Sequence, residues 1–191
     1  MKSTWGKRVA AFAAVLLSTS GAWARTEGPL SLSTLTRKAG MIFGGEVIRV
    51  ERVPPAQAGG EAAMQITFRV TQAVRGARLS QTVVVREWDG LWQHRGEHYR
   101  VGEHVMLFLH RPSVEGLSSP IGGRSGRFDI DRRNNVVLRP EQVRMIAITL
   151  PAKATRVRPA ASARASQDGG ATPTVPYPDF LRIVRDAAVR R

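Results

Sequence analysis

Residues 41–53 read MIFGGEVIRVERV, a run of β-branched, aromatic and charged side chains that is interrupted by Gly44-Gly45. β-branched and aromatic residues favour strands because they pack well on a pleated surface. Paired glycines inside a strand are typical of a bulge or a sharp bend, such as the corner of a barrel. The stretch therefore predicts one strand that bends in its middle and a sheet that curls with it.

Other parts of the chain show strand patterns of two kinds. In MQITFRVTQAV, residues 64–74, apolar and polar side chains alternate with the period of a half-buried strand. HVMLFLHR, residues 104–111, is apolar on both faces, which predicts a central strand covered on two sides. Shorter strands are expected at 81–88, 126–130 and 136–138, and short helices at 30–38 and 140–150. One face of the second helix carries Val143, Ile146 and Ala147.

Together these elements predict a mainly β domain over residues 25–150. Short strands separated by turns, with one strand bent at a double glycine and short helices at its flanks, fit a small OB-like β-barrel of about five or six strands, closed or nearly closed. An open β-sandwich is the alternative architecture. The chain has no cysteine, so its fold has to be held by a hydrophobic core without disulfides.

The same strands carry a resemblance. The order LTRKAGMIFGGEVIRVE, FRVTQAVRG, TVVVRE, YRVGEHVMLFLHR and GGRSGRF, within residues 30–140, resembles a group of exported bacterial proteins of unassigned activity. Their core is similar to the OB-like domain of the tissue inhibitors of metalloproteinases and of netrin modules. In those inhibitors a cysteine at the mature N-terminus presents its amine and carbonyl to the protease zinc. This chain has no cysteine, so the inhibitory mechanism does not carry over and no inhibitory residues are assigned.

The first 24 residues have the pattern of a secretory signal peptide. Basic Lys2, Lys7 and Arg8 precede an apolar run over 9–17, and Ala22-Trp23-Ala24 forms a small-residue cleavage site. The alternative is a membrane anchor, but the run is about half of the roughly 20 residues that a bilayer span needs. Cleavage after Ala24 removes three positive charges and lowers the net charge from +14 to +11. The sequence thus predicts an exported protein, periplasmic or secreted.

The C-terminal part has a different composition. Residues 151–176 are rich in Ala, Pro, Ser, Gly and Arg and poor in large apolar residues, which predicts a disordered basic linker. Residues 177–191 place Phe180 and Val184 on one stripe and arginines elsewhere, as in an amphipathic helix. Whether this helix docks on the domain is left open.

The glycine-rich stretch GLSSPIGGRSGRF, residues 116–128, invites comparison with a phosphate-binding loop. Such a loop runs from a strand into a helix, whose N-terminal amides hold the anion. Here the stretch lies between two expected strands, so we interpret it as turns and bulges. Its serines lack the sharp strand-to-helix turn of a catalytic nucleophile. The carboxylate pairs Glu87 with Asp89 and Asp129 with Asp131 stand beside arginines and are interpreted as a solvated, ion-paired surface.

All four histidines of the chain lie within residues 94–110, together with nearby carboxylates. His94 and His98 are weak candidates for a zinc site with a nearby carboxylate, because three or four ligands have to converge on the ion. His104 and His110 are six residues apart along a strand, about 20 Å, and cannot share one ion. Ordinary loop and strand-end histidines are the simpler interpretation, and we expect neither a metal nor a cofactor.

Aromatic and basic residues gather around the predicted loop 89–103. If exposed, they suit a binding surface for a sugar, an anionic polymer or a protein. The candidate residues are Trp88, Trp92, Arg95, Tyr99 and Arg100. The alternative is that the aromatic side chains fold inward and cap one end of the barrel.

No catalytic set emerges from the sequence, so the leading hypothesis is a non-enzymatic exported binding module that contacts an envelope or secreted protein. A second hypothesis is an electrostatic binder of anionic envelope polymers or of a membrane surface, with the terminal helix lying on that surface. A nucleic-acid binder fits the barrel and the charge, but the signal peptide argues against it. A metal-dependent hydrolase using residues 87–104 is the remaining alternative. The oligomeric state is left open.

Overall fold

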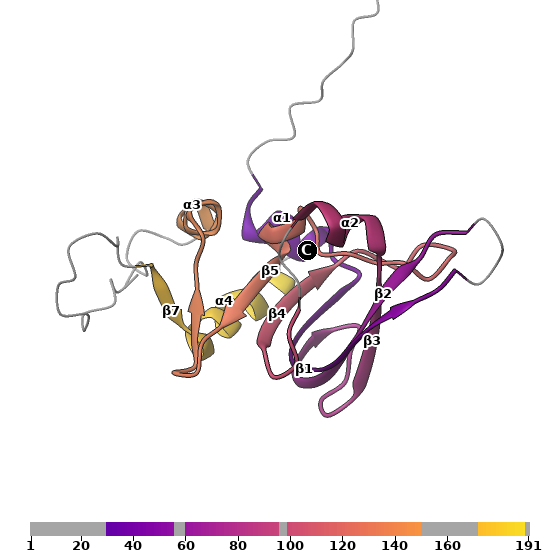
Figure 1. The fold of residues 1–191 in the computed structure, drawn as a ribbon. Helices are drawn as coiled ribbons and strands as arrows, with labels where there is room; N and C mark the ends of the chain where they lie inside the picture. The colour runs from indigo at the N-terminus through magenta and orange to yellow at the C-terminus, as the bar shows by residue number, and fades with distance from the viewer. Residues whose placement is uncertain (1–29, 56–59, 96–98, 150–171, 190–191) are drawn as a thin grey trace, which may run out of the picture.

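The computed structural model describes residues 30–55, 60–95, 99–149 and 172–189. The predicted signal peptide and most of the predicted linker lie outside these ranges. One antiparallel sheet contains seven strands in the order β3-β2-β1-β4-β5-β6-β7 (Figure 1). The strands are β1 (Met41–Val53), β2 (Ala63–Arg75), β3 (Thr82–Trp88), β4 (His104–Leu109), β5 (Arg127–Ile130), β6 (Asn135–Val137) and β7 (Thr174–Pro176). The helices are α1 (Leu32–Lys38), α2 (Asp89–Arg95), α3 (Pro140–Thr149) and α4 (Tyr177–Val189), with a 3₁₀ turn η1 (Gly123–Gly126). The predicted mainly β class is confirmed.

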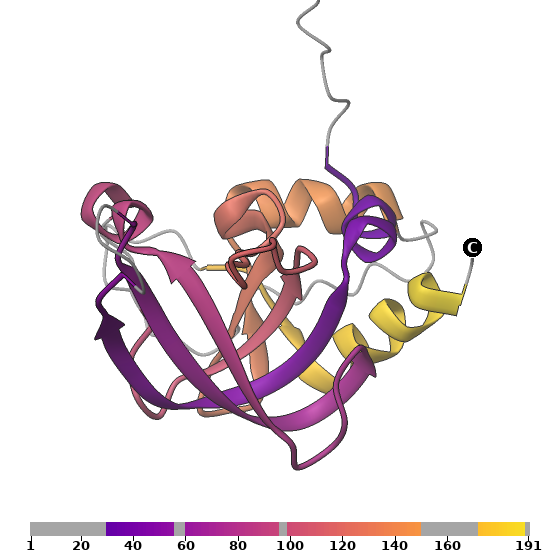
Figure 2. The same cartoon turned by 90° about the vertical axis from the view of Figure 1, so that its right-hand side faces the viewer.

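The bend predicted in β1 is confirmed. Its pairing with β2 shifts register between Gly44 and Gly45, and again at two neighbouring points of the strand. The first half of β1 pairs with both β2 and β4, whereas the second half pairs only with β2. Figure 2 shows β1 as one long curved strand. A Cβ at Gly45 would lie 2.9 Å from the carbonyl oxygen of Arg69, so the close approach of β2 requires glycine here.

The prediction of a closed or nearly closed barrel of five or six strands is wrong. β5, β6 and β7 extend the sheet beyond β4, and the two edge strands, β3 and β7, do not pair with each other. The curl of β1–β4 is bridged only locally by the segment 117–120. Isolated bridges join Leu117 to Arg86 of β3 and Pro120 to Leu109 of β4. Phe128 of β5, Val136 of β6 and Val175 of β7 belong to the same buried cluster as side chains of the helices.

β4 is covered on both faces, as its sequence predicts. Val105, Leu107 and Leu109 point into the curl of the sheet, where they join an inner cluster with residues of β1, β2 and β3. Met106 and Phe108 point to the opposite face and join an outer cluster with the helices. All five side chains are at most 2% exposed. The alternation of β4 thus divides the core into an inner and an outer cluster.

The helices α1, α3 and α4 cover the outer face. The side chain of Ser31 caps α1 by accepting a hydrogen bond from the Thr34 amide at 3.1 Å. The predicted C-terminal helix is confirmed as α4, which docks on the sheet with its apolar side buried. The hypothesis of a membrane-surface binder required this apolar side to lie on the membrane. In the folded domain the side is buried and is not available for that contact. Within the described residues, no helix is long and apolar enough to span a bilayer.

Four local predictions are wrong. The expected polar loop 89–103 begins with the helix α2, and the end of the expected linker forms the strand β7. In α3, the buried side chains are Gln142, Met145 and Ile146, while Ala147 is exposed. Gln142 turns the helix this way because its amide donates to the Arg127 carbonyl at 2.7 Å. The fourth wrong prediction is that Glu87 and Asp89 belong to a solvated surface, because both residues are buried.

The glycine-rich stretch is built from turns, as predicted. Gly116, Gly122 and Gly123 have positive φ angles, and the only helical element in the stretch is the four-residue 3₁₀ turn η1, which leads into β5. A strand-to-helix phosphate loop is therefore not formed. A Cβ at Gly126 would lie 2.4 Å from the carbonyl oxygen of Ile121, so this tight turn requires glycine.

Candidate binding surface

Trp88 is an exposed aromatic side chain held in one position. It lies at the end of β3, and the residue is 42% exposed. Its indole N–H donates to the Glu61 carboxylate at 2.7 Å. The ring lies against Gly90, where a Cβ would come within 2.5–2.7 Å of three ring carbons. An exposed tryptophan that is already ordered loses little conformational entropy when a partner covers it.

Beside Trp88, the outer edge of β3 is only partly covered. The hydrogen bonds from Asp89 to Ala62 (3.0 Å) and from Val70 to Gln81 (2.9 Å) set which residues of β3 face β2. By alternation, the backbone groups of Thr82, Val84 and Arg86 face away from β2. The carbonyl of Arg86 accepts a hydrogen bond from the Ser118 amide at 2.7 Å.

The remaining half of that edge has no strand beside it. In the part of the chain that the structure describes, no strand pairs with Thr82 and Val84 on the side away from β2. Val84 is 52% exposed and lies on the same face of β3 as Trp88. The edge therefore offers free N–H and C=O groups at Thr82 and Val84, on a strand whose outer face also carries two exposed side chains, Val84 and Trp88.

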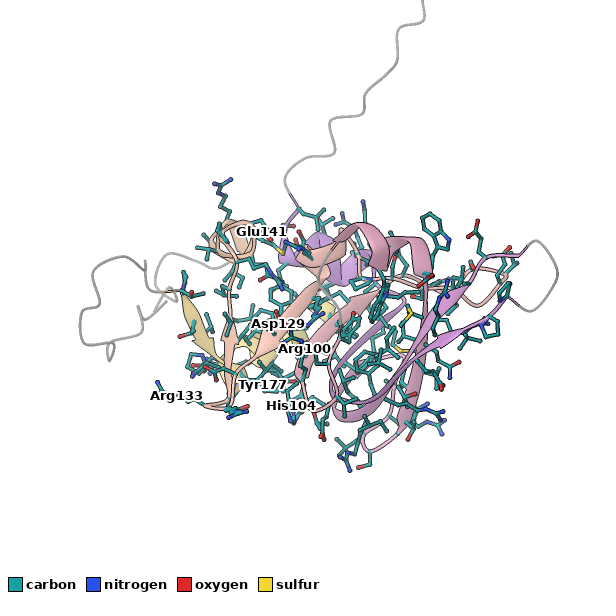
Figure 3. All side chains as sticks on the ribbon, viewed as in Figure 1. Arg100, His104, Asp129, Arg133, Glu141 and Tyr177 are labelled. Atoms are coloured by element: carbon teal, nitrogen blue, oxygen red, sulfur yellow. The ribbon has the colours of Figure 1, made fainter. Side chains whose placement is uncertain are left out.

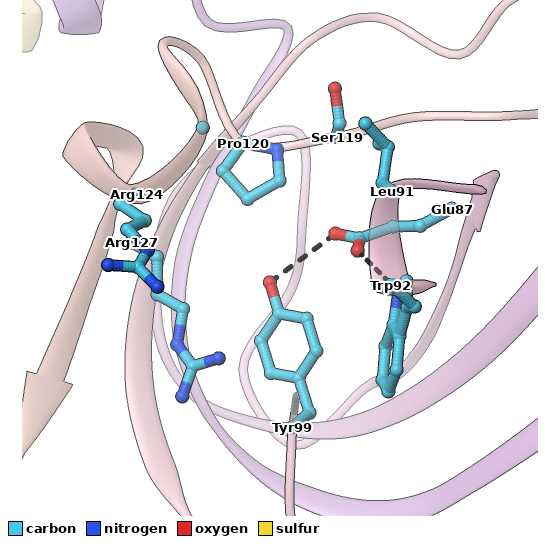
Figure 4. Close-up of a pocket in the computed structure, with 9 residues that line it drawn as sticks. Glu87, Leu91, Trp92, Tyr99, Ser119, Pro120, Arg124 and Arg127 are labelled. Carbon is cyan, nitrogen blue, oxygen red and sulfur yellow. Dashed lines mark hydrogen bonds between the residues drawn. The ribbon is translucent and has the colours of Figure 1, made fainter. Parts of the chain in front are cut away.

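Trp92 and Tyr99 instead turn inward and cap the inner cluster. Tyr99 is buried and packs edge-on against Phe68, with ring centroids 5.4 Å apart. Both side chains meet the buried carboxylate of Glu87 (Figure 4). The Trp92 indole N–H donates to Glu87 Oε2 at 3.0 Å, and the Tyr99 hydroxyl lies 3.5 Å from Oε1. Glu87 is thus the shared acceptor that places two aromatic rings.

Arg127, whose side chain is only 12% exposed, completes this group. The guanidinium of Arg127 lies over the Tyr99 ring, 4.3 Å from its centroid, and bonds Asp129 at 2.8 Å and Glu103 at 3.1 Å. Burial raises the pKa of the Tyr99 hydroxyl well above its usual value, and the Glu87 carboxylate raises this pKa further. The group is therefore a set of mutually satisfied polar side chains, in which Tyr99 stays protonated at neutral pH.

Only a small cavity remains beside Glu87 and Tyr99. Its volume of about 50 Å³ is space for a few water molecules. Leu91, Pro120 and Arg124 also line it. Known ligand pockets are several times larger, at roughly 300–1,000 Å³. The inward-facing group therefore suits a structural role better than the binding of an organic ligand.

Arg100 lies apart from Trp88, in a groove between the turn before β4 and the strands β5 and β6. The groove has a volume of about 710 Å³ and also contains His104 and Arg132. Figure 3 shows Arg100 and His104 near Asp129, which lines the same groove. Its carboxylates are engaged within the fold: Glu103 and Asp129 bond Arg127, and Asp131 accepts hydrogen bonds from the turn that follows it. The groove consequently has no strong charge of either sign.

The predicted surface residues do not form one surface. Trp88 and Arg100 are exposed in different places, Trp92 is half-buried and Tyr99 is buried. Arg95 belongs to α2, but its side chain is not described. The sequence could not show that Val84 is part of the surface, because alternation alone does not reveal which edge of a strand stays free. The one available signal was Gly90, which leaves room for the Trp88 ring.

The histidines do not meet within the described part of the chain. His104 and His110 are exposed at the two ends of β4, as predicted. His98 lies outside the described residues, and of His94 only the backbone, in α2, is described. Among the described residues, no group of three His, Cys, Asp or Glu side chains is placed to hold a metal ion.

This geometry stands without support from known proteins. The chain matches no family model, no curated protein and no solved structure.

Proposed function

We propose that this protein is an exported, non-enzymatic binding module that takes an extended segment of an envelope or secreted protein alongside β3. The observation that supports this proposal is the free half-edge at Thr82 and Val84, on the strand that also carries the ordered Trp88 ring. A partner strand would gain main-chain hydrogen bonds from the edge and side-chain contacts from Val84 and Trp88. This is the β-augmentation mode of peptide recognition.

The chain itself uses the other half of this edge in the same way. Residues 116–118 run parallel to β3 and donate the Ser118 amide to Arg86. An incoming segment beside Thr82 and Val84 would extend the backbone pairing of residues 116–118 along the same edge, towards the start of β3. From Thr82 to Val85 the free edge is about 10 Å long, which suits a segment of three or four residues.

The opposite edge of the sheet is protected. β7 has only three residues and ends at Pro176, which has no N–H, and Pro173 directly precedes it. Short edge strands and prolines are common ways of preventing unwanted strand addition. β3 has neither feature: it has seven residues, three of them consecutive valines. The contrast favours β3 as the edge that receives a partner.

The proposal includes two expectations from the sequence. Export rests on the signal-peptide pattern of residues 1–24. The OB-like identity rests on the resemblance to exported bacterial proteins with a domain similar to that of the metalloproteinase inhibitors. The curl of β1–β4 and its local bridge at 117–120 are compatible with an OB-like domain. OB-like folds host many functions, so the edge geometry carries the functional argument.

Site-specific photo-crosslinking tests the proposal. The full-length protein is expressed in its native host with a photoreactive residue at position 84 and is crosslinked in the cell envelope. It should capture one partner at both low and high salt. The same residue at Val189, which is 82% exposed on α4, is the control and should not capture it. Retention at high salt is expected because main-chain hydrogen bonds and apolar contacts are screened far less than surface charge pairs.

A pair of variants then separates edge pairing from side-chain contact. Val84→Pro removes one outward N–H without touching the bonds to β2, so it should abolish capture by a photoreactive residue placed at 88. Val84→Thr keeps the N–H and should preserve capture. Thermal unfolding establishes that both variants are folded. Capture that is equal in both variants, or that disappears at high salt, would refute the edge as the binding site.

A further inference from the structure

A second groove, separate from the one that contains Arg100, lies where the C-terminal ends of α1 and α4 meet. It has a volume of about 520 Å³. Figure 2 shows the two helices close to each other on this side of the sheet, and they are in contact. The groove is lined by Ser33, Arg37, Ala39, Gly40, Arg75, Arg111, Ala187 and Ala188. Three of these eight residues are arginines and none is acidic, so the groove is strongly positive.

Arg75 is fixed at the base of this groove. Its guanidinium donates to the carbonyl oxygens of Thr36 and of Ala39 at the end of α1, and to that of Ala188 in the last turn of α4 at 3.3 Å. Helix C-termini have partial negative charge and on their own would repel an anion. Because Arg75 bonds these carbonyls, it offsets that charge and holds the two helix ends together.

Arg37 and Arg111 have a different position. Both are exposed, and neither forms an ion pair or a side-chain hydrogen bond within the described residues. They come from α1 and from the chain just after β4, so two separate segments bring them to the lining of the groove that also contains Arg75. The aliphatic part of the Arg111 side chain lies over Gly40, where a Cβ would be 2.4 Å from Arg111 Cγ. This packing fixes the start of the Arg111 side chain beside the groove.

We propose that this groove binds a phosphate ester, with Arg37 and Arg111 as the binding side chains and Arg75 as the residue that positions the helix ends. Guanidinium groups form paired, charge-assisted hydrogen bonds with phosphate oxygens. The terminal oxygens of a phosphate group are arranged tetrahedrally and can engage arginines that approach from separate segments, whereas the two oxygens of a carboxylate lie in one plane. The site is separate from the β3 edge and does not depend on the function proposed for it.

Binding of inorganic pyrophosphate to the full-length protein tests the site. The double variant Arg37→Gln with Arg111→Gln should weaken binding about tenfold or more in calorimetric titration at low ionic strength. The matched control is Arg132→Gln with Arg133→Gln, two exposed arginines in the turn between β5 and β6, and it should change the affinity by less than about twofold. Both variants remove two positive charges, so a general electrostatic attraction would be weakened equally.

A second measurement identifies the source of the phosphate. Vesicles of phosphatidylglycerol in phosphatidylcholine are offered to the same three proteins. If these vesicles bind through Arg37 and Arg111, the ligand is a lipid headgroup; if only pyrophosphate does, the ligand is a soluble or polymeric phosphate ester. Either result supports the site. Equal weakening in both double variants, or no binding of either probe to the unaltered protein, would overturn the proposal.

Discussion

The two clusters on either side of β4 each bury one of the two tyrosines of the chain, but in opposite ways. In the inner cluster, the Tyr99 hydroxyl lies near the Glu87 carboxylate and its ring lies under Arg127. In the outer cluster, the Tyr177 hydroxyl is buried with no hydrogen-bond partner among the described residues. It lies instead against Gly44, where a Cβ would be 1.9 Å from the hydroxyl oxygen.

The different surroundings of the two hydroxyls show what holds each tyrosine ring in position. Tyr99 is held by polar partners from other elements, which are expensive to leave unsatisfied and so define one arrangement. Tyr177 is held by shape, because only a glycine in β1 leaves space for its hydroxyl. The inner arrangement should therefore be sensitive to the removal of polar groups, and the outer arrangement to changes of volume.

The largest expected effect is common to both clusters. Phe68→Ala in the inner cluster and Phe180→Ala in the outer one each remove a fully buried ring. Each substitution should lower the free energy of unfolding by about 3–5 kcal/mol, because transfer and cavity costs add. Chemical denaturation followed by circular dichroism measures both losses.

These two variants also test whether α4 is an integral part of the domain. The ring centroid of Phe180 lies 4.7 Å from that of Phe128 in β5. Because β5 pairs with β4, which contributes side chains to both clusters, the two clusters should unfold in one transition. If Phe180→Ala instead produced an early transition that left the rest of the sheet folded, the outer cluster would be an independent unit and the comparison would fail.

The next effect belongs to the inner cluster alone. Glu87→Leu removes the acceptor that serves Trp92 and Tyr99, and should lower the free energy of unfolding by about 3 kcal/mol, since one buried and one half-buried donor lose their shared acceptor. Glu87→Gln retains one acceptor oxygen and should cost about 1 kcal/mol. Urea denaturation compares the two. A Leu variant as stable as the unaltered protein would mean that packing, and not Glu87, places the rings.

The sequence made the sheet predictable but not this polar group. Alternation in β2 and the all-apolar β4 correctly indicated which side chains are buried, because a strand has a fixed period of two residues. Glu87 fits that alternation as a buried position, yet a carboxylate beside Arg86 was interpreted as solvated. Its partners Trp92 and Tyr99 come from α2 and from beyond it, and no local pattern relates these residues to β3.

The fold beyond β6 was less predictable for a similar reason. β7 has three residues, including one proline, within a stretch of low hydrophobicity, so its composition indicated a linker. Val175 is nevertheless buried, because pairing with β6 and the neighbouring α4 supply contacts that the segment cannot make alone. Among the candidate surface residues, Trp88 and Arg100 are exposed, whereas Tyr99 joins the inner cluster, which corresponds to the alternative of inward-folding aromatic side chains.

A smaller effect should distinguish the outer cluster. Gly44→Ala places a methyl group against the Tyr177 hydroxyl and should lower the free energy of unfolding by about 2 kcal/mol through overpacking. In the double variant with Tyr177→Phe, most of this loss should be recovered, because the nearest remaining ring atom, Cζ, is 3.2 Å from the added Cβ. A double-mutant cycle measures this coupling. If the two effects were simply additive, Gly44 would not be the residue that accommodates Tyr177.

The smallest effect at neutral pH, and the most specific one, is that of Tyr177→Phe alone. The substitution removes a buried hydroxyl that has no partner, so the free energy of unfolding should be unchanged or raised by up to about 1 kcal/mol. Tyr99→Phe removes a partnered hydroxyl and should instead lower it slightly. Parallel urea denaturations at neutral pH compare the two variants. A loss of stability in Tyr177→Phe would reveal a partner for this hydroxyl.

Alkaline pH enlarges this difference. Burial raises the pKa of Tyr177 to about 12, an effect that Arg185 partly offsets, whereas a tyrosine in the unfolded chain has a pKa of about 10. Between these values the unfolded state releases its proton first, so the folded protein binds more protons and loses stability as the pH rises. The loss attributable to Tyr177 approaches about 3 kcal/mol at pH 12 and is absent below pH 10. Tyr177→Phe should remove this part of the alkaline loss, and urea denaturation at a series of pH values from 8 to 12 measures it. Because burial also raises the pKa of Tyr99, a residual loss should persist in the variant. Identical pH profiles with and without the Tyr177 hydroxyl would show that it is solvated, and the contrast between the two clusters would then disappear.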